Sequence, residues 1–284
     1  MGKKCEKING DLTVILVYMN GDLRYTCGGK VDLCMDKPVF KRKIYDEIYE
    51  WKENRSDKYA LLIKGARRVG KSTIAEEFAK KEFKSYILID FAHTSKAIID
   101  LFDDTYDLDF FFLQLQQLMG IRLYEKESVI IFDEVQLFPK ARQAIKYLVA
   151  DGRYKYIETG SLLSIKKNTK DILIPSEEHK ISMFPMDFEE FLWAIGDEVS
   201  AETIRHLIKN KKPAGNAMHR NLMRIFRLYM LVGGMPQAVN EYLQTNNFRK
   251  VDTIKRDILN LYEDDFKKID STGKLSLLFD AIPA

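Results

Sequence analysis

The chain has 284 residues, of which 46% are apolar and 31% charged, so it can bury a core and reads neither as a disordered chain nor as a membrane protein. Its 45 basic and 42 acidic residues leave a net charge of +3, which indicates no polyanionic partner for the chain as a whole. The longest mainly apolar stretch, residues 12–19, is far shorter than the roughly 20 residues that cross a bilayer. We therefore expect a cytoplasmic protein that does not contact a membrane.

The first 34 residues differ from the rest of the chain. They contain all three cysteines, Cys5, Cys27 and Cys34, an odd number without zinc-site spacing, which fits a reducing compartment. Residues 12–19 and 22–27 flank Asn20-Gly21, a pair typical of tight hairpin turns. Because a lone hairpin is marginally stable in water, we expect residues 1–34 to be an extension without a functional role, and Met35 could serve as an alternative start.

From Lys41 onward, short apolar segments alternate with segments whose apolar residues recur at helical spacing. The expected helices lie near 41–54, 72–83, 110–118 and 144–149, and the expected strands at 58–64, 85–90, 128–134, 155–161 and 180–184. This alternation predicts a parallel sheet covered by helices on both faces. After about residue 188 the pattern predicts helices only, interrupted at 212–213, 233–234 and 246–247.

One motif carries the chemistry. The segment GARRVGKST matches G-x-x-x-x-G-K-[ST] and lies between a predicted strand and a predicted helix, the context that a phosphate-binding loop (P-loop) requires. Its glycines let backbone amides converge on phosphate oxygens, and the helix N-terminus points its positive dipole end at the same place. Lys71 neutralises phosphate charge and the Ser72 hydroxyl can ligate Mg²⁺. The predicted nucleotide contacts are Gly65, Ala66, Arg67, Arg68, Val69, Gly70, Lys71, Ser72 and Thr73.

The apolar strand ending VIIFDE supplies the acidic half of the site. Asp133 and Glu134 emerge at its C-terminal end, where ligands bind in open α/β sheets. Asp133 can hold Mg²⁺ and Glu134 can polarise the attacking water, whereas a lone acidic pair would more often be a helix cap. GTPases carry a D-x-x-G element, but position 136 is Gln, which favours ATP over GTP.

A third predicted strand ends in Thr159-Gly160-Ser161. Its hydroxyls can contact the γ-phosphate or the attacking water, although Thr-Gly-Ser is also an ordinary turn sequence, and the sequence does not separate the two interpretations. Glu158 is unusual inside a strand, and we expect it to pair with Lys155 or Arg153.

The helical region carries a basic surplus. Residues 205–268 contain 13 Lys or Arg and 6 Asp or Glu, a surplus of +7 that fits either a DNA-binding face or a solvated helix surface. Gly233-Gly234-Met235-Pro236 is either a tight turn, which we favour slightly, or a hinge. The four histidines lack metal-ligand spacing.

Together with MFPMDFEEFLWA (183–194) and LVGGMPQAV (231–239), these motifs resemble the prokaryotic AAA-type ATPases of the archaeal-ATPase-like group from about residue 36 to the end. The resemblance implies that Lys71, Ser72 and Thr73 bind phosphate and Mg²⁺, that Asp133 binds Mg²⁺ and Glu134 the water, and that Thr159 or Ser161 senses the γ-phosphate. The chain departs from the group at His179-Lys180, where relatives often carry Gly-Arg, and it stops where relatives resemble the opening of a winged-helix domain.

We therefore predict an α/β fold, a three-layer AAA-type P-loop NTPase, followed by an all-helical lid and the start of a winged-helix region. The expected divisions are 1–34 (extension), 35–195 (ATPase domain), 196–270 (helical lid) and 271–284 (start of a truncated C-terminal domain).

The expected activity is Mg²⁺-dependent ATP hydrolysis that drives a conformational change, with Glu134, Lys71, Thr159 and Ser161 as catalytic residues and Ser72 and Asp133 as metal ligands. A charge-stabilising arginine would be Arg67, Arg68, Arg153, or one from a neighbouring subunit of an oligomer. Two alternatives remain: a nucleotide-gated module that binds DNA or protein through the basic helices or the missing C-terminal part, and a small-molecule kinase.

Overall fold

The computed structural model describes the strands 14–19 and 22–27 and residues 39–103, 107–161, 175–270 and 272–282. The chain divides by contacts into two units, Met1–Pro38 and Val39–Ala284. In the first unit, strands β1 (Val14–Met19) and β2 (Asp22–Cys27) pair antiparallel, as the sequence predicts. The Asn20-Gly21 turn itself lies outside the described residues, as do Cys5 and Cys34.

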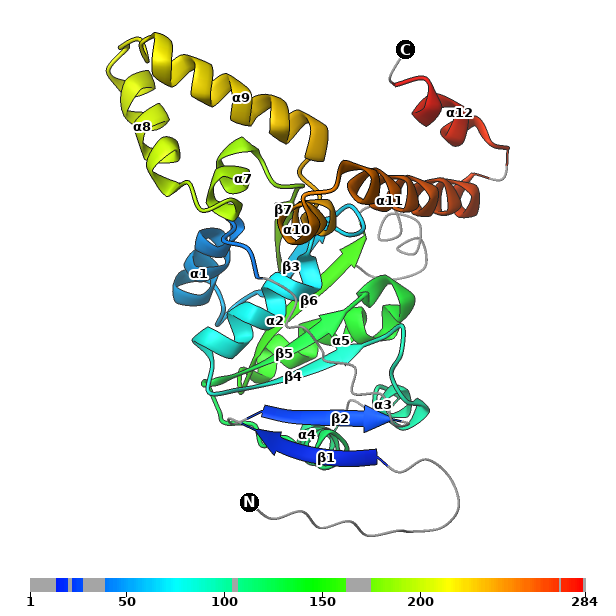
Figure 1. Cartoon of the computed structure of the whole chain (residues 1–284). Coiled ribbons are helices and arrows are strands. Elements are labelled where there is room, and N and C mark those ends of the chain that lie inside the picture. The colour runs from blue at the N-terminus through cyan, green and yellow to red at the C-terminus, as the bar shows by residue number, and fades with distance from the viewer. Residues whose placement is uncertain are drawn as a thin grey trace. The chain divides into compact units, whose positions relative to one another are not determined.

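The second unit contains the predicted parallel sheet (Figure 1). Its strands lie in the order β4-β5-β6-β3-β7, and every neighbouring pair runs parallel. The strands β3 and β5 are short apolar runs, and in β5 and β6 every residue is buried. The strands are β3 (Ala60–Gly65), β4 (Ser85–Asp90), β5 (Ser128–Asp133), β6 (Lys155–Ser161) and β7 (Glu178–Met183).

Helices cover both faces of the sheet, which confirms the predicted three-layer class. One face packs on α1 and α2 and the other on α3, α4 and α5, each over its own apolar cluster. Residues next to one another in a strand point to opposite faces, so β6 sends Tyr156 into one cluster and Ile157 into the other. The helices are α1 (Ile44–Asn54), α2 (Lys71–Glu82), α3 (Lys96–Leu101), α4 (Leu108–Met119) and α5 (Pro139–Asp151), and a 3₁₀ turn, η1 (Val135–Leu137), follows β5.

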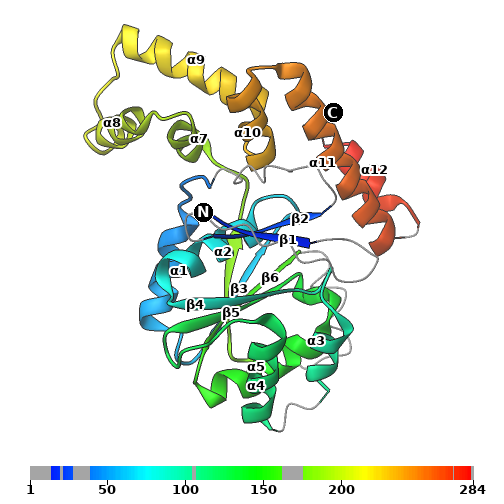
Figure 2. The same cartoon turned by 60° about the horizontal axis from the view of Figure 1, so that its bottom comes forward.

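After β7 the described chain is helical, as predicted. The helices are α7 (Phe188–Ala194), α8 (Glu198–Lys209), α9 (Asn216–Val232), α10 (Pro236–Thr245), α11 (Phe248–Ile269) and α12 (Lys274–Asp280). A third apolar cluster joins α7, α9 and α10, and Phe191 and Leu192 of α7 are fully buried in it. No described helix is long and apolar enough to cross a bilayer. Figures 1 and 2 both place α9 farther from the sheet than α7 and α10.

Candidate nucleotide-binding site

The predicted P-loop joins β3 to α2 at the C-terminal edge of the sheet. Gly70 precedes α2 with a φ of 99°, a left-handed conformation that favours glycine. A methyl group on Gly65 would lie 2.3 Å from the carbonyl oxygen of Met183, so β7 excludes any side chain there. No side chain caps α2, and the amides of its first turn lack helical acceptors, which leaves them directed at the loop. This is a backbone cradle suited to an anion.

Lys71 lies at the start of α2 with its side chain folded along the loop. Its Nζ donates to the carbonyl oxygens of Ala66 at 2.9 Å and Gly65 at 3.3 Å, and the residue is buried. Burial lowers the pKa of Lys71 from its ordinary value, and the charges of Glu134 and Asp133 act in the opposite direction. A phosphate group at the loop would likewise favour the charged ammonium.

Strands β5 and β6 bring the predicted hydroxyl and carboxylate residues together. The Ser72 hydroxyl donates to Oδ1 of Asp133 at 2.7 Å, and the hydroxyl of Thr159 donates to the same oxygen. Because β6 lies between β3 and β5, Thr159 is placed beside both the P-loop and the acidic strand. Ser161 is buried and pairs in register with Gly65, which is the first residue of the P-loop. The strand end Thr159–Ser161 is thus buried beside the P-loop and is not a surface turn.

Glu134 follows β5 in a left-handed conformation, with a φ of 54°. Its backbone N–H lies 3.4 Å from the Thr159 hydroxyl oxygen, to which it donates. The side-chain amide of Gln136, a buried residue, donates to the Glu134 carboxylate. This contact was not predicted from the sequence, where Gln136 served only as an argument against GTP. The position of Gln136 two residues after Glu134 is the one sequence feature that indicates it.

Two contacts from distant segments hold the outer side of the P-loop, and neither was predicted. The Arg67 guanidinium lies 3.0 Å from Oδ1 of Asp265 on α11. The Tyr262 hydroxyl, one turn earlier on the same helix, donates to the Arg67 carbonyl oxygen at 2.9 Å. Helix α11 therefore touches the loop through both the side chain and the backbone of one residue.

Arg42, just before α1, supports the loop from the other side. Its Nη1 donates to the Val69 carbonyl at 3.0 Å and its Nη2 to the Phe184 carbonyl at 2.6 Å. Its Nε lies 3.2 Å from a carboxylate oxygen of Glu190, which also closes the capping box of α7 with Asp187. The distinctive MFPMDFEEF segment thus fastens the P-loop to the helical region.

Two predictions about charged residues are wrong. Arg153 cannot serve the site, because it precedes β6 at the opposite edge of the sheet, where its guanidinium pairs with Asp151 and Asp109. Glu158 pairs with neither Lys155 nor Arg153, since Lys155 binds Asp57 instead. Among the described residues the two Glu158 oxygens have no hydrogen-bond partner. Arg68 is exposed in the loop, with a φ of 65°.

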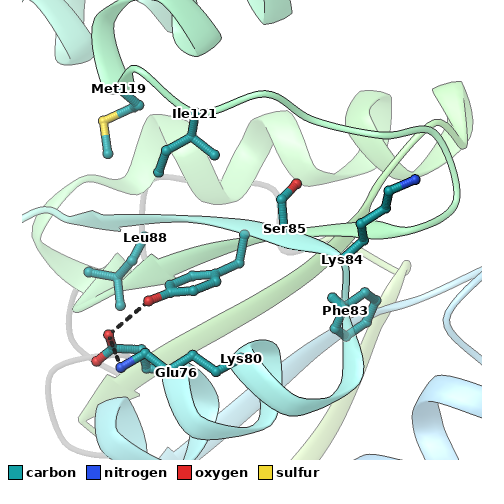
Figure 3. A pocket seen from close by; sticks show the side chains of 9 residues that line it. Glu76, Lys80, Phe83, Lys84, Ser85, Leu88, Met119 and Ile121 are labelled. Atoms are coloured by element: carbon teal, nitrogen blue, oxygen red, sulfur yellow. Dashed lines mark hydrogen bonds and ion pairs between the residues drawn. The ribbon is translucent and has the colours of Figure 1, made fainter. Parts of the chain in front are cut away.

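A cavity of about 490 Å³ lies away from this site, along the edge strand β4 (Figure 3). It adjoins the last turns of α2, whereas the P-loop adjoins the first, so it is not the nucleotide cradle. In it the Tyr86 hydroxyl donates to Glu76, which also pairs with Lys80. The lining residues are Glu76, Lys80, Phe83, Lys84, Ser85, Tyr86, Leu88, Met119 and Ile121.

Residues 57–192 match the model of a family described as an AAA domain, and residues 223–284 match a domain of unknown function (DUF8612). An uncharacterized protein of Methanocaldococcus jannaschii is 23% identical over 291 residues; the match covers 95% of this chain but only 59% of that relative, so this chain spans just over half of its length.

Two solved structures share low similarity with the chain. C. elegans PCH-2 matches with a TM-score of 0.38 and 12% identity, over 74% of this chain and 65% of that one. A closed-state reconstruction of Hsp104 with ATPγS and FITC casein matches with a TM-score of 0.43 and 14% identity, over 85% and 46% of the two chains.

Proposed function

We propose that this chain, whose residues 57–192 match an AAA domain, binds ATP with Mg²⁺ and hydrolyses the bond between its β- and γ-phosphates, which gives ADP and phosphate. The observation that carries the proposal is the hydrogen-bonded set Ser72, Asp133 and Thr159, which joins the P-loop helix to the two strands beside it. Three segments far apart in sequence converge there on one point next to an uncapped helix N-terminus. The nine residues Gly65–Thr73 would contact the phosphates.

The residues present fit a magnesium ion. The Ser72 hydroxyl and Asp133 Oδ1 are hard oxygen ligands 2.7 Å apart, and Mg²⁺ favours a few such ligands completed by water and phosphate oxygens. When bound, the ion neutralises charge on the phosphate oxygens.

The chain's own groups then divide the chemistry. Lys71 faces the β- and γ-phosphates and stabilises the charge that develops as the bond to the γ-phosphate breaks. Glu134 accepts hydrogen bonds from the attacking water and takes its proton as general base. The Thr159 hydroxyl, next to both acids, is suited to sense whether the γ-phosphate is present. Ser161, at the end of the same strand, is a second hydroxyl at the rim of the cradle.

The helical region would change conformation when ATP is hydrolysed. Helix α11 contacts Arg67, and a methyl group on Gly70 would lie 3.8 Å from Pro236, the first residue of α10. A change in the loop on nucleotide binding or release is therefore transmitted to two helices. We propose that this motion is the useful output, delivered to residues 196–284.

The test is Glu134→Gln. This variant retains the side-chain shape but cannot take a proton, so we expect ATP affinity to stay within about twofold while turnover falls by a factor on the order of 10²–10⁴. Fluorescent-nucleotide titration measures the first quantity and phosphate release the second. As the matched loss-of-binding variant, Lys71→Ala should weaken both. Equal loss of binding and turnover in Glu134→Gln would remove Glu134 from its role.

A nucleotide-gated binding module with little turnover is the second candidate, and the hydrogen bond from Gln136 to the Glu134 carboxylate favours it, because that contact competes with water. Gln136→Ala separates the two. If Gln136 restrains the base, the variant turns over ATP faster than the parent at unchanged affinity. If the parent is already an active hydrolase, Gln136→Ala leaves its rate unchanged or lowers it.

A further inference from the structure

The basic surplus of the helical region is confined to part of it. Between residues 203 and 240 the sequence contains no Asp or Glu, but seven Lys or Arg and two His. Residues 241–268 contain six basic and six acidic residues, which balance. The whole surplus of +7 therefore belongs to the end of α8, the connection to α9, and α9 itself. The basic residues are Arg205, Lys209, Lys211, Lys212, Arg220, Arg224 and Arg227.

All seven are exposed. Arg205 pairs with Glu189 at 2.7 Å, but among the described residues no ion pair joins an acid to any of the other six. Exposed lysines elsewhere in the chain are often compensated, as Lys80 is by Glu76 and Lys81 by Glu77. A merely solvated helix surface commonly interleaves both signs, so this uncompensated face indicates an anionic partner.

Three of the arginines form a stripe on α9. Arg220, Arg224 and Arg227 are spaced four and three residues apart, which places them on one face of the helix. Arg220 Nε donates to the Asn216 carbonyl, and one Arg224 nitrogen donates to the Asn221 side chain. Each guanidinium keeps further donors for a ligand, because it carries five N–H groups. Helix α9 has 17 residues and is about 25 Å long, roughly twice the width of a DNA major groove.

The opposite face of α9 is already used, which decides between two kinds of anionic partner. Ile225 and Val232 are buried in the third apolar cluster, and the Phe226 ring packs edge-on against Phe188 at 5.2 Å. A helix that lies in a membrane surface needs its apolar face free to enter the lipid. On the side of α9 that the described structure leaves exposed, the apolar side chains of Met223, Met230 and Leu231 are interleaved with the arginines and form no separate apolar face. A lipid surface is therefore disfavoured.

We propose that the basic face formed by Lys209, Lys211, Lys212, Arg220, Arg224 and Arg227 binds the phosphate backbone of duplex nucleic acid. The warrant is charge complementarity: duplex DNA presents one phosphate per about 1.7 Å of its axis, and a face without any acid suits such a uniform polyanion. Protein interfaces instead pair both signs around an apolar centre. The proposal is independent of ATP hydrolysis, because none of these residues lies at the P-loop.

The test uses the full chain and a fluorescein-labelled 30-base-pair duplex, followed by fluorescence anisotropy over a salt series. We expect binding that weakens steeply with salt. In Arg220→Gln/Arg224→Gln/Arg227→Gln, affinity at low salt should fall at least about tenfold and the salt slope should flatten by about 2–3, close to one per lost phosphate contact. A second variant, Lys209→Gln/Lys211→Gln/Lys212→Gln, changes the α8–α9 connection and avoids any dependence on the stability of α9.

The matched control is Lys80→Gln/Lys81→Gln/Lys84→Gln, which removes the same charge from lysines that already have acidic partners. It should bind the duplex as the parent does. Equal loss in the control, or no binding by the parent at low salt, would overturn the proposal. Tighter binding to polyglutamate or to phosphatidylserine vesicles than to the duplex would also overturn it, in favour of an acidic protein or a membrane.

Discussion

At the scale of single residues, the least expected group is the Glu158 carboxyl. It lies fully buried in β6 on the face opposite Thr159, under α5. Beside it, Arg142 of α5 forks onto Glu178 of β7 with distances of 2.6 and 2.7 Å, so the arginine is already neutralised. Burial raises the pKa of Glu158 well above its usual range, the charge of Glu178 adds to this, and Arg142 and Lys180 act the other way. Burial and the neighbouring Glu178 carboxylate therefore favour the protonated form of Glu158 in the folded protein.

This predicts a stability effect with a definite sign. The folded chain holds the proton of this carboxyl more tightly than the unfolded chain does. As pH rises above 4.5, the ordinary pKa of the carboxyl, the unfolded chain loses this proton first, so the free energy of unfolding falls. Glu158→Gln keeps the neutral shape at every pH. We expect its gain in unfolding free energy to be small at pH 5 and to grow by at most about 1.4 kcal/mol per pH unit above that. Urea unfolding at pH 5 and pH 8 measures it.

Glu178→Gln is the matched control, because it removes a neighbouring carboxylate of the same size but leaves Arg142 buried and unpaired. It should destabilise the protein by about 3–5 kcal/mol. If Glu158→Gln destabilised the protein equally at both pH values, Glu158 would be charged and partnered.

The mistaken pairing of Glu158 has a simple physical reason. Residues three apart in a strand point to opposite faces, so Lys155 and Glu158 cannot meet within β6. Proximity in sequence suggested the pairing, but the alternation of side chains between the two faces of a strand excludes it. The P-loop, by contrast, was predictable residue by residue, because its spacing is local and its chemistry fixes both glycines and Lys71.

At the scale of elements, α11 and the P-loop form a contact that spans 198 residues of sequence between Arg67 and Asp265. The Tyr262 hydroxyl adds a hydrogen bond to the Arg67 carbonyl, so the helix holds the loop backbone directly. Because binding at one site and order at another affect each other equally, nucleotide on the loop should protect α11 from opening.

We expect Tyr262→Phe/Asp265→Asn to weaken ATP binding by roughly 2–12-fold, the cost of about one hydrogen bond. The same variant should abolish any ATP-induced slowing of amide hydrogen exchange in residues 258–268. Titration with a fluorescent nucleotide and hydrogen exchange with and without ATP measure the two effects.

The control for this contact lies on the same helix. Arg256→Gln breaks an exposed pair with Asp252 at 2.8 Å that does not touch the loop, and should change neither quantity. If the double variant kept the nucleotide affinity and the ATP-induced protection from hydrogen exchange, α11 would not be coupled to the P-loop.

The sequence predicted the strands and helices better than it predicted the tertiary contacts between them. Within the described part of residues 41–184, the five sheet strands and the helices α1, α2, α4 and α5 were expected, because burial of one helix face or of a whole strand leaves a recognisable apolar pattern. Short elements escaped, since α3 and η1 have six and three residues and too few turns to show a period. The contacts of Arg42 and Asp265 with the loop escaped for another reason: no local pattern encodes a partner so far along the chain.

At the scale of the whole molecule, one segment links the basic face to the nucleotide site. Helix α9 ends at Val232, and Gly233 follows it with a φ of 82°, a value that favours glycine. Gly234 then pairs with the chain after β7, since its carbonyl accepts from the Met186 N–H at 2.7 Å. The Tyr229 hydroxyl of α9 donates to the Met186 carbonyl at 2.8 Å, and α10 begins two residues after Gly234. The two glycines thus serve different purposes. Gly233 takes the left-handed φ after α9, and Gly234 lets the backbone approach Met186 closely.

Gly234→Ala tests whether this approach matters. An added methyl group would lie 2.1 Å from the Met186 carbonyl oxygen, a backbone atom that cannot move alone, so the segment must shift. Overpacking of this kind costs about 1–3 kcal/mol, and a chain of this size should lose roughly 2–4 °C of Tm per kcal/mol. Because α10 starts beside Gly70, we also expect weaker ATP binding.

Gln237→Ala, an exposed change in the first turn of α10, provides the matched background and should leave both Tm and ATP affinity unchanged. Thermal unfolding with and without ATP distinguishes the possible results. A lower Tm with a reduced stabilisation by ATP supports the link. A lower Tm with full stabilisation by ATP would mean that the packing of α10 near Gly70 does not affect nucleotide binding. The proposed conformational change would then have to pass through the contact between α11 and Arg67, which the fold also supplies.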